Sequence, residues 1–114
     1  MNKKYIIRKN EDIENLINNS NTKKIVNKYY IVYFLKNDLP YNRYCVSVSK
    51  KIGKAHTRNL YKRRIKDILM KFKYNNSNDY VIILRKSILD INYDNMKSEL
   101  SLLLKGEKND KKNK

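Results

Sequence analysis

The chain has little of several residue types on which other proteins rely for stability or chemistry. Its 114 residues include two glycines, one proline, one cysteine, one histidine and no tryptophan. The single cysteine, Cys45, permits no internal disulfide, which fits a reducing cytoplasm, and with His56 it gives no cluster of metal ligands. Two glycines exclude a glycine-rich phosphate loop. Neither a Ser/His/Asp set nor paired carboxylates in an apolar setting are visible, so the pattern indicates binding rather than catalysis by side chains.

Acidic residues are also scarce. The chain has 27 lysines and arginines against 11 aspartates and glutamates, and its formal net charge is +16. Such an excess is typical of a protein that binds nucleic acid. No apolar run approaches the ~18 residues of a spanning helix, and no signal-peptide pattern opens the chain. We therefore expect a cytoplasmic protein without membrane contact. It should form one nucleic-acid-binding domain over residues 1–106, followed by a basic, disordered tail over residues 107–114.

The positive charge is most concentrated between residues 50 and 66, which include no acidic residue. Apolar residues then recur at the spacing of one helix face, which predicts an amphipathic helix ending near Lys73. Thr57 is chemically the best N-cap and Lys54 is the alternative. The basic side chains of this helix face either solvent, as on an ordinary surface helix, or a polyanion. The apolar stripe consists of Tyr61, Ile65, Ile68, Leu69 and Phe72.

A motif in this stretch carries a resemblance to a known family. The segments Ser49 to Ala55 (SKKIGKA), Thr57 to Asn59 (TRN) and Lys62 to Lys66 (KRRIK) resemble the signature of the bacterial ribonuclease P protein subunit. In that signature a Gly, an Ala, an Arg-Asn pair and a Lys-Arg pair follow a strand at these offsets. Two positions depart from it. Leu60 stands where the family usually has a third basic residue, and His56 where it usually has a small apolar one.

The resemblance implies a function. Ribonuclease P removes the 5′ leader of precursor tRNA by endonucleolytic hydrolysis, and in bacteria its RNA is the catalyst. The protein would be a subunit of this enzyme, as a monomer in a 1:1 ribonucleoprotein with ribonuclease P RNA, acting on precursor tRNA. It would bind no cofactor alone, and the holoenzyme would require Mg²⁺ through its RNA. The resemblance assigns these residues to the catalytic RNA: Arg58, Asn59, Lys62, Arg63 and Lys66, with Lys51 and Lys54 as helpers.

The resemblance also implies a cleft for the leader. Its residues carry over as Ile13, Ile17 and Tyr33. Asn10 is expected to cap the short helix that carries the two isoleucines. The family has aromatic side chains at these helix positions, whereas aliphatic ones pack against a base without stacking.

Tyr33 belongs to a predicted strand over residues 28–35. Alternation places Tyr29, Ile31, Tyr33 and Leu35 on one face of this strand and Tyr30, Val32 and Phe34 on the other. The residues alone leave open whether the tyrosines form a stacking platform for single-stranded RNA or amphipathic surface cover. Only the resemblance favours Tyr33.

The predicted fold is α+β, a two-layer sandwich with the order αβββαβα. Strands are expected over residues 25–26, 28–35, 43–49 and 80–84. Asp94 should cap the last helix, and Gly106 should end it. Residues 1–9 form either a disordered terminus or an RNA-contacting arm. A strand–helix–strand unit normally crosses over right-handed, whereas the resemblance implies the left-handed crossover of a ribosomal-protein-domain-like fold.

Three other functions are alternatives. A ribosomal or ribosome-associated protein of similar charge would bind folded rRNA without preferring a leader. A nucleoid-type DNA binder is the second, and the tyrosine-rich strand argues against it. A free-standing nuclease is the least favoured, because acidic metal ligands are lacking.

Overall fold

Four strands form one mixed sheet in a computed structural model that describes residues 3–72 and 75–105. The strands are β1 (Lys23–Val26), β2 (Tyr30–Lys36), β3 (Arg43–Ser47) and β4 (Asn78–Leu84). Their order across the sheet is β1-β2-β4-β3. β2 pairs antiparallel with both β1 and β4, whereas β3 runs parallel to β4. The outer edges of the sheet are therefore formed by β1 and β3.

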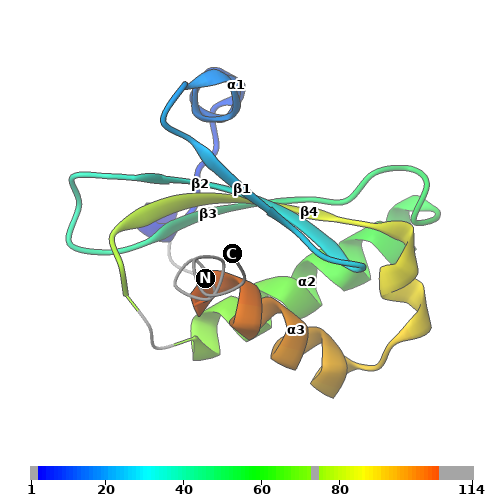
Figure 1. The fold of residues 1–114 in the computed structure, drawn as a ribbon. Helices are drawn as coiled ribbons and strands as arrows, with labels where there is room; N and C mark the ends of the chain where they lie inside the picture. Colours follow the sequence, from blue (N-terminus) through cyan, green and yellow to red (C-terminus); the bar gives the residue numbers. More distant parts are fainter. Residues whose placement is uncertain (1–2, 73–74, 106–114) are drawn as a thin grey trace.

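Helices lie on both faces of this sheet (Figure 1). α1 (Asn10–Asn18) lies on one face, and α2 (Ala55–Lys71) and α3 (Tyr93–Lys105) lie together on the other. α2 connects the parallel strands β3 and β4. Two short 3-10 helices, η1 (Lys3–Tyr5) and η2 (Lys86–Asp90), precede α1 and follow β4. The structure adds η2 where the sequence predicts a plain connection.

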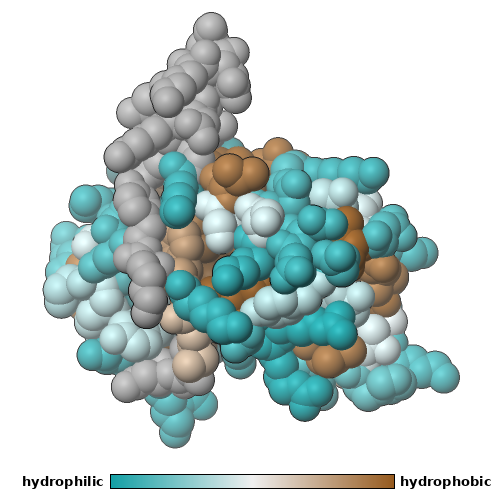
Figure 2. All heavy atoms as spheres, turned by 90° about the horizontal axis from the view of Figure 1, so that it is seen from below, coloured by the Kyte–Doolittle hydropathy of each residue, from teal (hydrophilic) through white to brown (hydrophobic). Residues whose placement is uncertain are grey.

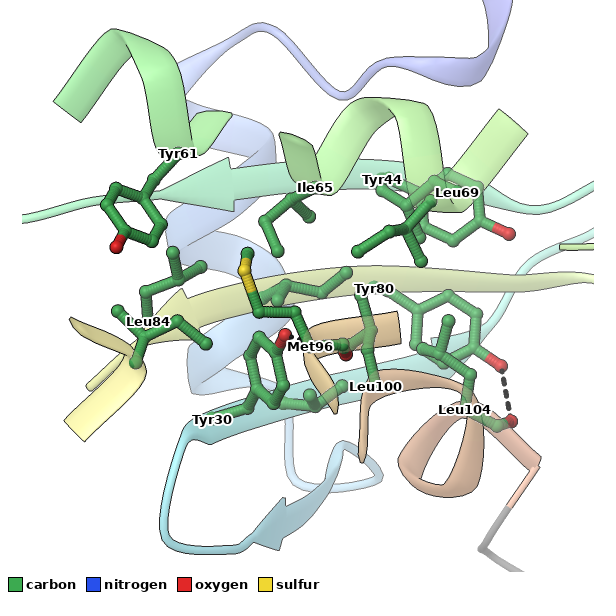
Figure 3. Close-up of a cluster of buried hydrophobic side chains, with 14 of the residues drawn as sticks. Tyr30, Tyr44, Tyr61, Ile65, Leu69, Tyr80, Leu84, Met96, Leu100 and Leu104 are labelled. Carbon is green, nitrogen blue, oxygen red and sulfur yellow. Dashed lines mark hydrogen bonds between the residues drawn. The ribbon is translucent and has the colours of Figure 1, made fainter. Parts of the chain in front are cut away.

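The larger core lies between the sheet and the pair of helices α2 and α3. Alternate residues of β2 point into it, so Tyr30, Val32 and Phe34 are buried. The predicted stripe of α2 also packs there, and Figure 3 shows Tyr61, Ile65 and Leu69 directed at the sheet. α3 completes the core with Met96, Leu100 and Leu104. Burial of this apolar surface is the main stabilising term of the fold.

Three tyrosines of this core have a structural role. The Tyr30 hydroxyl donates a hydrogen bond to the Met96 carbonyl (3.0 Å), and burial raises the pKa of Tyr30. The Tyr80 hydroxyl donates to Asn76 Oδ1 (2.9 Å) and lies 3.4 Å from the Leu104 carbonyl oxygen (Figure 3). The Tyr44 ring stacks on that of Tyr80, with centroids 5.5 Å apart. Buried tyrosine hydroxyls need such partners, so these rings are not available to RNA.

The N-cap of α2 is Lys54 rather than the favoured Thr57. Residues 49–53 form a tight turn that ends at Gly53, whose φ is +156°. The helix starts directly after this turn, and the Arg58 amide donates to the Lys54 carbonyl (2.9 Å). Thr57 packs against Gly53 instead, because a Cβ on Gly53 would lie 3.1 Å from Thr57 Cγ2. The threonine side chain is therefore used for packing, not for capping.

Other predicted boundaries were wrong by one or two residues. α1 starts at Asn10, and its N-cap is Lys9 rather than the predicted Asn10. The Asn95 amide donates to Asn92 Oδ1 (2.9 Å), so α3 is capped by Asn92 rather than by the predicted Asp94. α2 ends at Lys71. β1 gains two residues at its start and β4 gains two, whereas β2 begins at Tyr30 and β3 ends at Ser47. Pairing with a neighbouring strand, which sequence propensity does not report, decides where these strands end. Gly106 and residues 107–114 lie outside the described residues.

The N-terminal segment runs along the outer edge of β3. The Ile7 amide donates to the Tyr44 carbonyl (2.8 Å), and Ile6 bridges Tyr44 in parallel register. The Ile7 side chain is 4% exposed. The disordered-terminus alternative therefore does not hold for residues 3–9.

Candidate nucleic-acid interface

The basic face of α2 is one half of the candidate site. Because its stripe of buried residues faces the sheet, the neighbouring sector of the helix faces away from the core. Arg58, Lys62 and Lys66 are spaced by four residues and therefore form one row along the helix. These three side chains are half-buried, whereas Asn59 and Arg63 beside them are exposed. The structure thus brings five of the residues predicted to bind the catalytic RNA onto one helix surface.

Lys51 and Lys54 lie at the N-terminal end of that surface. Both are exposed and belong to the segment that connects β3 to α2. The amino end of a helix presents unsatisfied N–H groups and a partial positive charge, which favour an anion. Arg58 follows in the first turn, and its Nε is buried without a hydrogen-bond partner in the described part of the chain.

The row on α2 reaches the outer edge of β3. Lys62 and Lys66 line a pocket together with Cys45 and Val46 of that strand. Burial raises the pKa of the Cys45 thiol, and the positive charges of the two lysines lower it in part. The raised pKa favours the protonated form of the thiol, which is the less reactive one.

The face of the sheet beneath α1 is the other half of the candidate site. A small core of Ile7, Leu16 and Val81 is buried there, and Ile13 and Tyr33 pack against it half-buried. The structure thus brings two of the three predicted leader residues into one cluster. The third, Ile17, lies on the same helix and is 36% exposed. It is not part of that cluster.

Tyr33 lies in the middle of a row that crosses all four strands. Lys24 of β1, Tyr33 of β2, Val81 of β4 and Cys45 of β3 are register partners. The Lys24 ammonium lies 5.5 Å from the centroid of the Tyr33 ring. This cation–π contact places a positive charge beside the ring, an arrangement suited to a nucleotide with its phosphate.

Sequence reasoning missed Lys24 and Cys45 as members of this surface. Cys45 lies within the strand predicted over residues 43–49, but the order of strands across the sheet was needed to place it in the same row as Tyr33, with Val81 between them. Lys24 lies outside the two-residue strand that the sequence predicts. The one sequence signal for Lys24 is alternation along the strand. Lys24 stands two residues before Val26 and therefore lies on the same face, which is exposed at Val26.

Other cationic side chains are committed within the protein. Arg43 forms a two-pronged ion pair with Asp79 (Nε to Oδ1 2.9 Å, Nη2 to Oδ2 2.6 Å), and this hydrogen bonding raises the pKa of Arg43. The Arg64 guanidinium lies 5.3 Å from the Tyr61 ring centroid. In residues 3–72 and 75–105 the only other ion pair joins Lys71 to Asp67. Within the part of the chain that the structure describes, none of the residues predicted to bind RNA forms such an ion pair.

The described residues contain neither a metal-binding cluster nor a membrane-spanning helix. Among them, no three His, Cys, Asp or Glu side chains gather in a group that could hold a metal ion. Within the same part of the chain, no helix has the length and apolar character needed to cross a bilayer.

Comparison with known proteins identifies the family. The family model for ribonuclease P matches residues 1–107. The chain belongs to the ribonuclease P family. It is 37% identical over 106 residues to the ribonuclease P protein component of Streptococcus thermophilus, with 92% of this chain and 94% of the relative covered. It is 38% identical over 109 residues to that of Mycoplasma mycoides subsp. mycoides, with 92% and 97% covered.

Solved ribonuclease P proteins have the same fold. A Staphylococcus aureus RNase P protein mutant with defective mRNA degradation activity matches with a TM-score of 0.84 and 30% identity, covering 93% of this chain and 90% of that one. The Thermotoga maritima protein matches with a TM-score of 0.79 and 30% identity, covering 87% and 94%.

These likenesses confirm the predicted bacterial ribonuclease P protein subunit and the α+β fold class. The chain is accordingly a protein component of an endoribonuclease. That enzyme is a ribonucleoprotein that takes part in tRNA processing. Family membership decides against the ribosomal and nucleoid-type alternatives.

Proposed function

We propose that this protein binds ribonuclease P RNA through the basic face of α2 and holds the 5′ leader of precursor tRNA on the sheet face beneath α1. The observation that carries the proposal is the junction of these two surfaces. Lys62 and Lys66 of α2 and Cys45 of the Tyr33 row line one pocket at the β3 edge. One RNA can therefore dock on the helix while a single strand crosses the sheet beside it.

The two surfaces have different tasks. Arg58, Lys62, Arg63 and Lys66 neutralise phosphates and Asn59 donates to them, with Lys51 and Lys54 extending the contact at the start of α2. Contacts of this kind supply affinity and salt dependence with little sequence information. Tyr33 stacks on a leader base, and Ile13 and Ile17 pack against the same strand.

Catalysis itself resides in the RNA under this proposal. The protein raises substrate affinity and reduces repulsion between RNA phosphates, so that the holoenzyme retains its Mg²⁺ ions through the RNA at lower concentration. No cofactor binds to the protein alone. The working unit is one protein with one RNA, and it acts in the cytoplasm.

The test is cleavage of precursor tRNA at low Mg²⁺ by a bacterial ribonuclease P RNA, with and without this protein. We expect cleavage at the mature 5′ end only with the protein, and loss of that rescue in the double variant Arg58→Ala with Lys62→Ala. Thermal unfolding of the variant should match that of the parent. A protein that binds RNA tightly without ever rescuing cleavage would contradict the proposal.

A further inference from the structure

A pocket lies on the outer edge of β3, at the point where the two proposed RNA surfaces meet. It has a volume of about 110 Å³ and is lined by the N-terminal segment, by β3 and by α2. We call it the edge pocket and define it by Ile6, Cys45, Val46, Lys62, Lys66 and Leu69. An apolar cavity of about 150 Å³ holds one benzene molecule. The edge pocket is smaller than that cavity but open to solvent on one side, so it can take one six-membered ring that stays partly exposed, and it is too small for a fused pair.

The walls of the edge pocket combine apolar and cationic groups. Ile6, Val46 and Leu69 supply apolar surface on three different elements. Lys62 and Lys66 are half-buried, so their methylene stems line the wall while the ammonium groups stay at the rim. They lie one helical turn apart, a rise of about 6 Å along the axis.

The floor of the edge pocket offers backbone hydrogen-bonding groups. The Tyr44 carbonyl faces outward, because it accepts from the Ile7 amide. Backbone groups of every second residue face the same edge of a strand, so the amide and carbonyl of Val46 also face outward. Within the described residues, Val46 forms no backbone hydrogen bond with the N-terminal segment. A ring with a polar edge finds partners there.

We propose that the edge pocket receives one unstacked pyrimidine base of the bound RNA, while Lys62 and Lys66 pair with the phosphates beside it. The base lies against Leu69 and Ile6, and its polar edge meets the Val46 backbone. This inference rests on the proposed function and adds to it a nucleotide-binding site beside the face that carries Tyr33. The inserted base fixes the register of the RNA, which phosphate contacts alone do not.

The test fills the edge pocket without removing a charge. Ile6 is half-buried on its wall, so Ile6→Trp occupies the space and leaves both lysines in place. Leu89→Trp, at a side chain in η2 that is 39% exposed, is the control of equal bulk. Affinity is measured at several salt concentrations, first for ribonuclease P RNA and then, in the assembled holoenzyme, for precursor tRNA with and without its leader.

We expect Ile6→Trp to weaken one of these affinities about tenfold, the order of effect that burial of one ring supplies. The slope of affinity against salt should not change, because the phosphate contacts persist. Loss of affinity for ribonuclease P RNA assigns the base to the catalytic RNA, and loss only with leader-bearing substrate assigns it to the leader. Unchanged affinity for both RNAs overturns the proposal, as does an equal loss in Leu89→Trp.

A second measurement on the unaltered protein covers the case in which Ile6→Trp fails to fold. RNAs that contain 4-thiouridine are irradiated in the complex, and the crosslinked peptide is identified. A crosslink within residues 44–46 supports the proposal, and crosslinks confined to other segments overturn it. Failure of the unaltered protein to bind either RNA or to rescue cleavage would instead contradict the proposed function, so the two failures are distinguishable.

Discussion

The two faces of the sheet are packed to different degrees. Among the described residues, 18 buried ones form one core cluster towards α2 and α3, whereas three do so towards α1. The same strands supply side chains to both faces. In β2, Tyr30 and Val32 are fully buried towards α2 and α3, whereas Tyr33 is half-buried towards α1. The face that holds the fold together is thus separated from the face that we assign to the leader.

This separation follows from alternation within each strand. One set of side chains can be selected for packing and the other for contact with RNA, without conflict between the two. The outside of the larger layer is mostly hydrophilic, as Figure 2 shows on the side of α2 and α3. The difference between the faces therefore predicts that substitutions on them affect different measurements.

The largest expected effect is on stability, from Tyr80→Ala in the larger core. The side chain is 1% exposed, stacks on Tyr44 and has hydrogen-bond partners. Removing a buried aromatic ring costs about 3–5 kcal/mol of unfolding free energy. Urea denaturation measures this decrease. The matched change Tyr33→Ala on the other face should cost about 1 kcal/mol, and an equal cost would show that the two faces do not differ.

The next effect is on RNA affinity, from Arg63→Ala with Lys66→Ala on α2. We expect affinity for ribonuclease P RNA to fall about a hundredfold at low salt, and the salt slope to decrease by roughly 0.7–0.9 for each phosphate that is no longer neutralised. Filter binding across a salt series measures both quantities, and the melting temperature should stay unchanged. Lys97→Ala with Lys105→Ala on α3 removes the same charge elsewhere. A similar decrease in that control would mean that only net charge matters.

A smaller and more selective effect is expected at Tyr33. Tyr33→Leu keeps an apolar side chain but removes the ring, and should weaken binding of leader-bearing precursor tRNA about tenfold. Tyr33→Phe keeps the ring and should bind nearly as the parent does. The holoenzyme is titrated with precursor and with mature tRNA. The assignment fails if the Leu variant loses equal affinity for both.

The smallest effect concerns an exposed cluster where α2 meets α3. Hydrogen bonds from Tyr93 and then from Lys71 hold the pKa of Asp67 below its usual value. A lowered folded-state pKa stabilises the protein above the unfolded pKa, and this contribution disappears as the pH falls through the folded value. Asp67→Asn should therefore lower the melting temperature slightly at pH 7, and by less at about pH 3, which is below the usual aspartate pKa of about 3.9. An equal shift at both pH values would exclude the ion pair as the cause.

Much of this arrangement could be predicted from the sequence, because it depends on local periodicity. The stripe from Tyr61 to Leu69 packs as its spacing predicts, and the division of β2 into two faces is confirmed. Which of the two faces is the larger core was not predictable, because both contain tyrosines. The larger core forms on the face of β2 that packs against α3, and α3 lies far from β2 along the chain.

The remaining features depend on interactions between distant residues. Ile6 and Ile7 were predicted as part of a terminus, and their place beside Tyr44 follows from a pairing that no local pattern signals. Thr57 has the chemistry of a cap but is committed to Gly53. The left-handed crossover came only from the resemblance, since the general rule for such units predicts the opposite hand.

The N-terminal segment also has a consequence for solubility. Ile6 and Ile7 cover part of the outer edge of β3, and β1 at the opposite edge carries Lys23 and Lys24. Uncovered strand edges recruit strands of other molecules, and lysines discourage this. Deleting residues 1–8 should leave β3 exposed and cause concentration-dependent aggregation, measurable by light scattering. In this protein a short segment before the first long helix would then act as a guard against self-association.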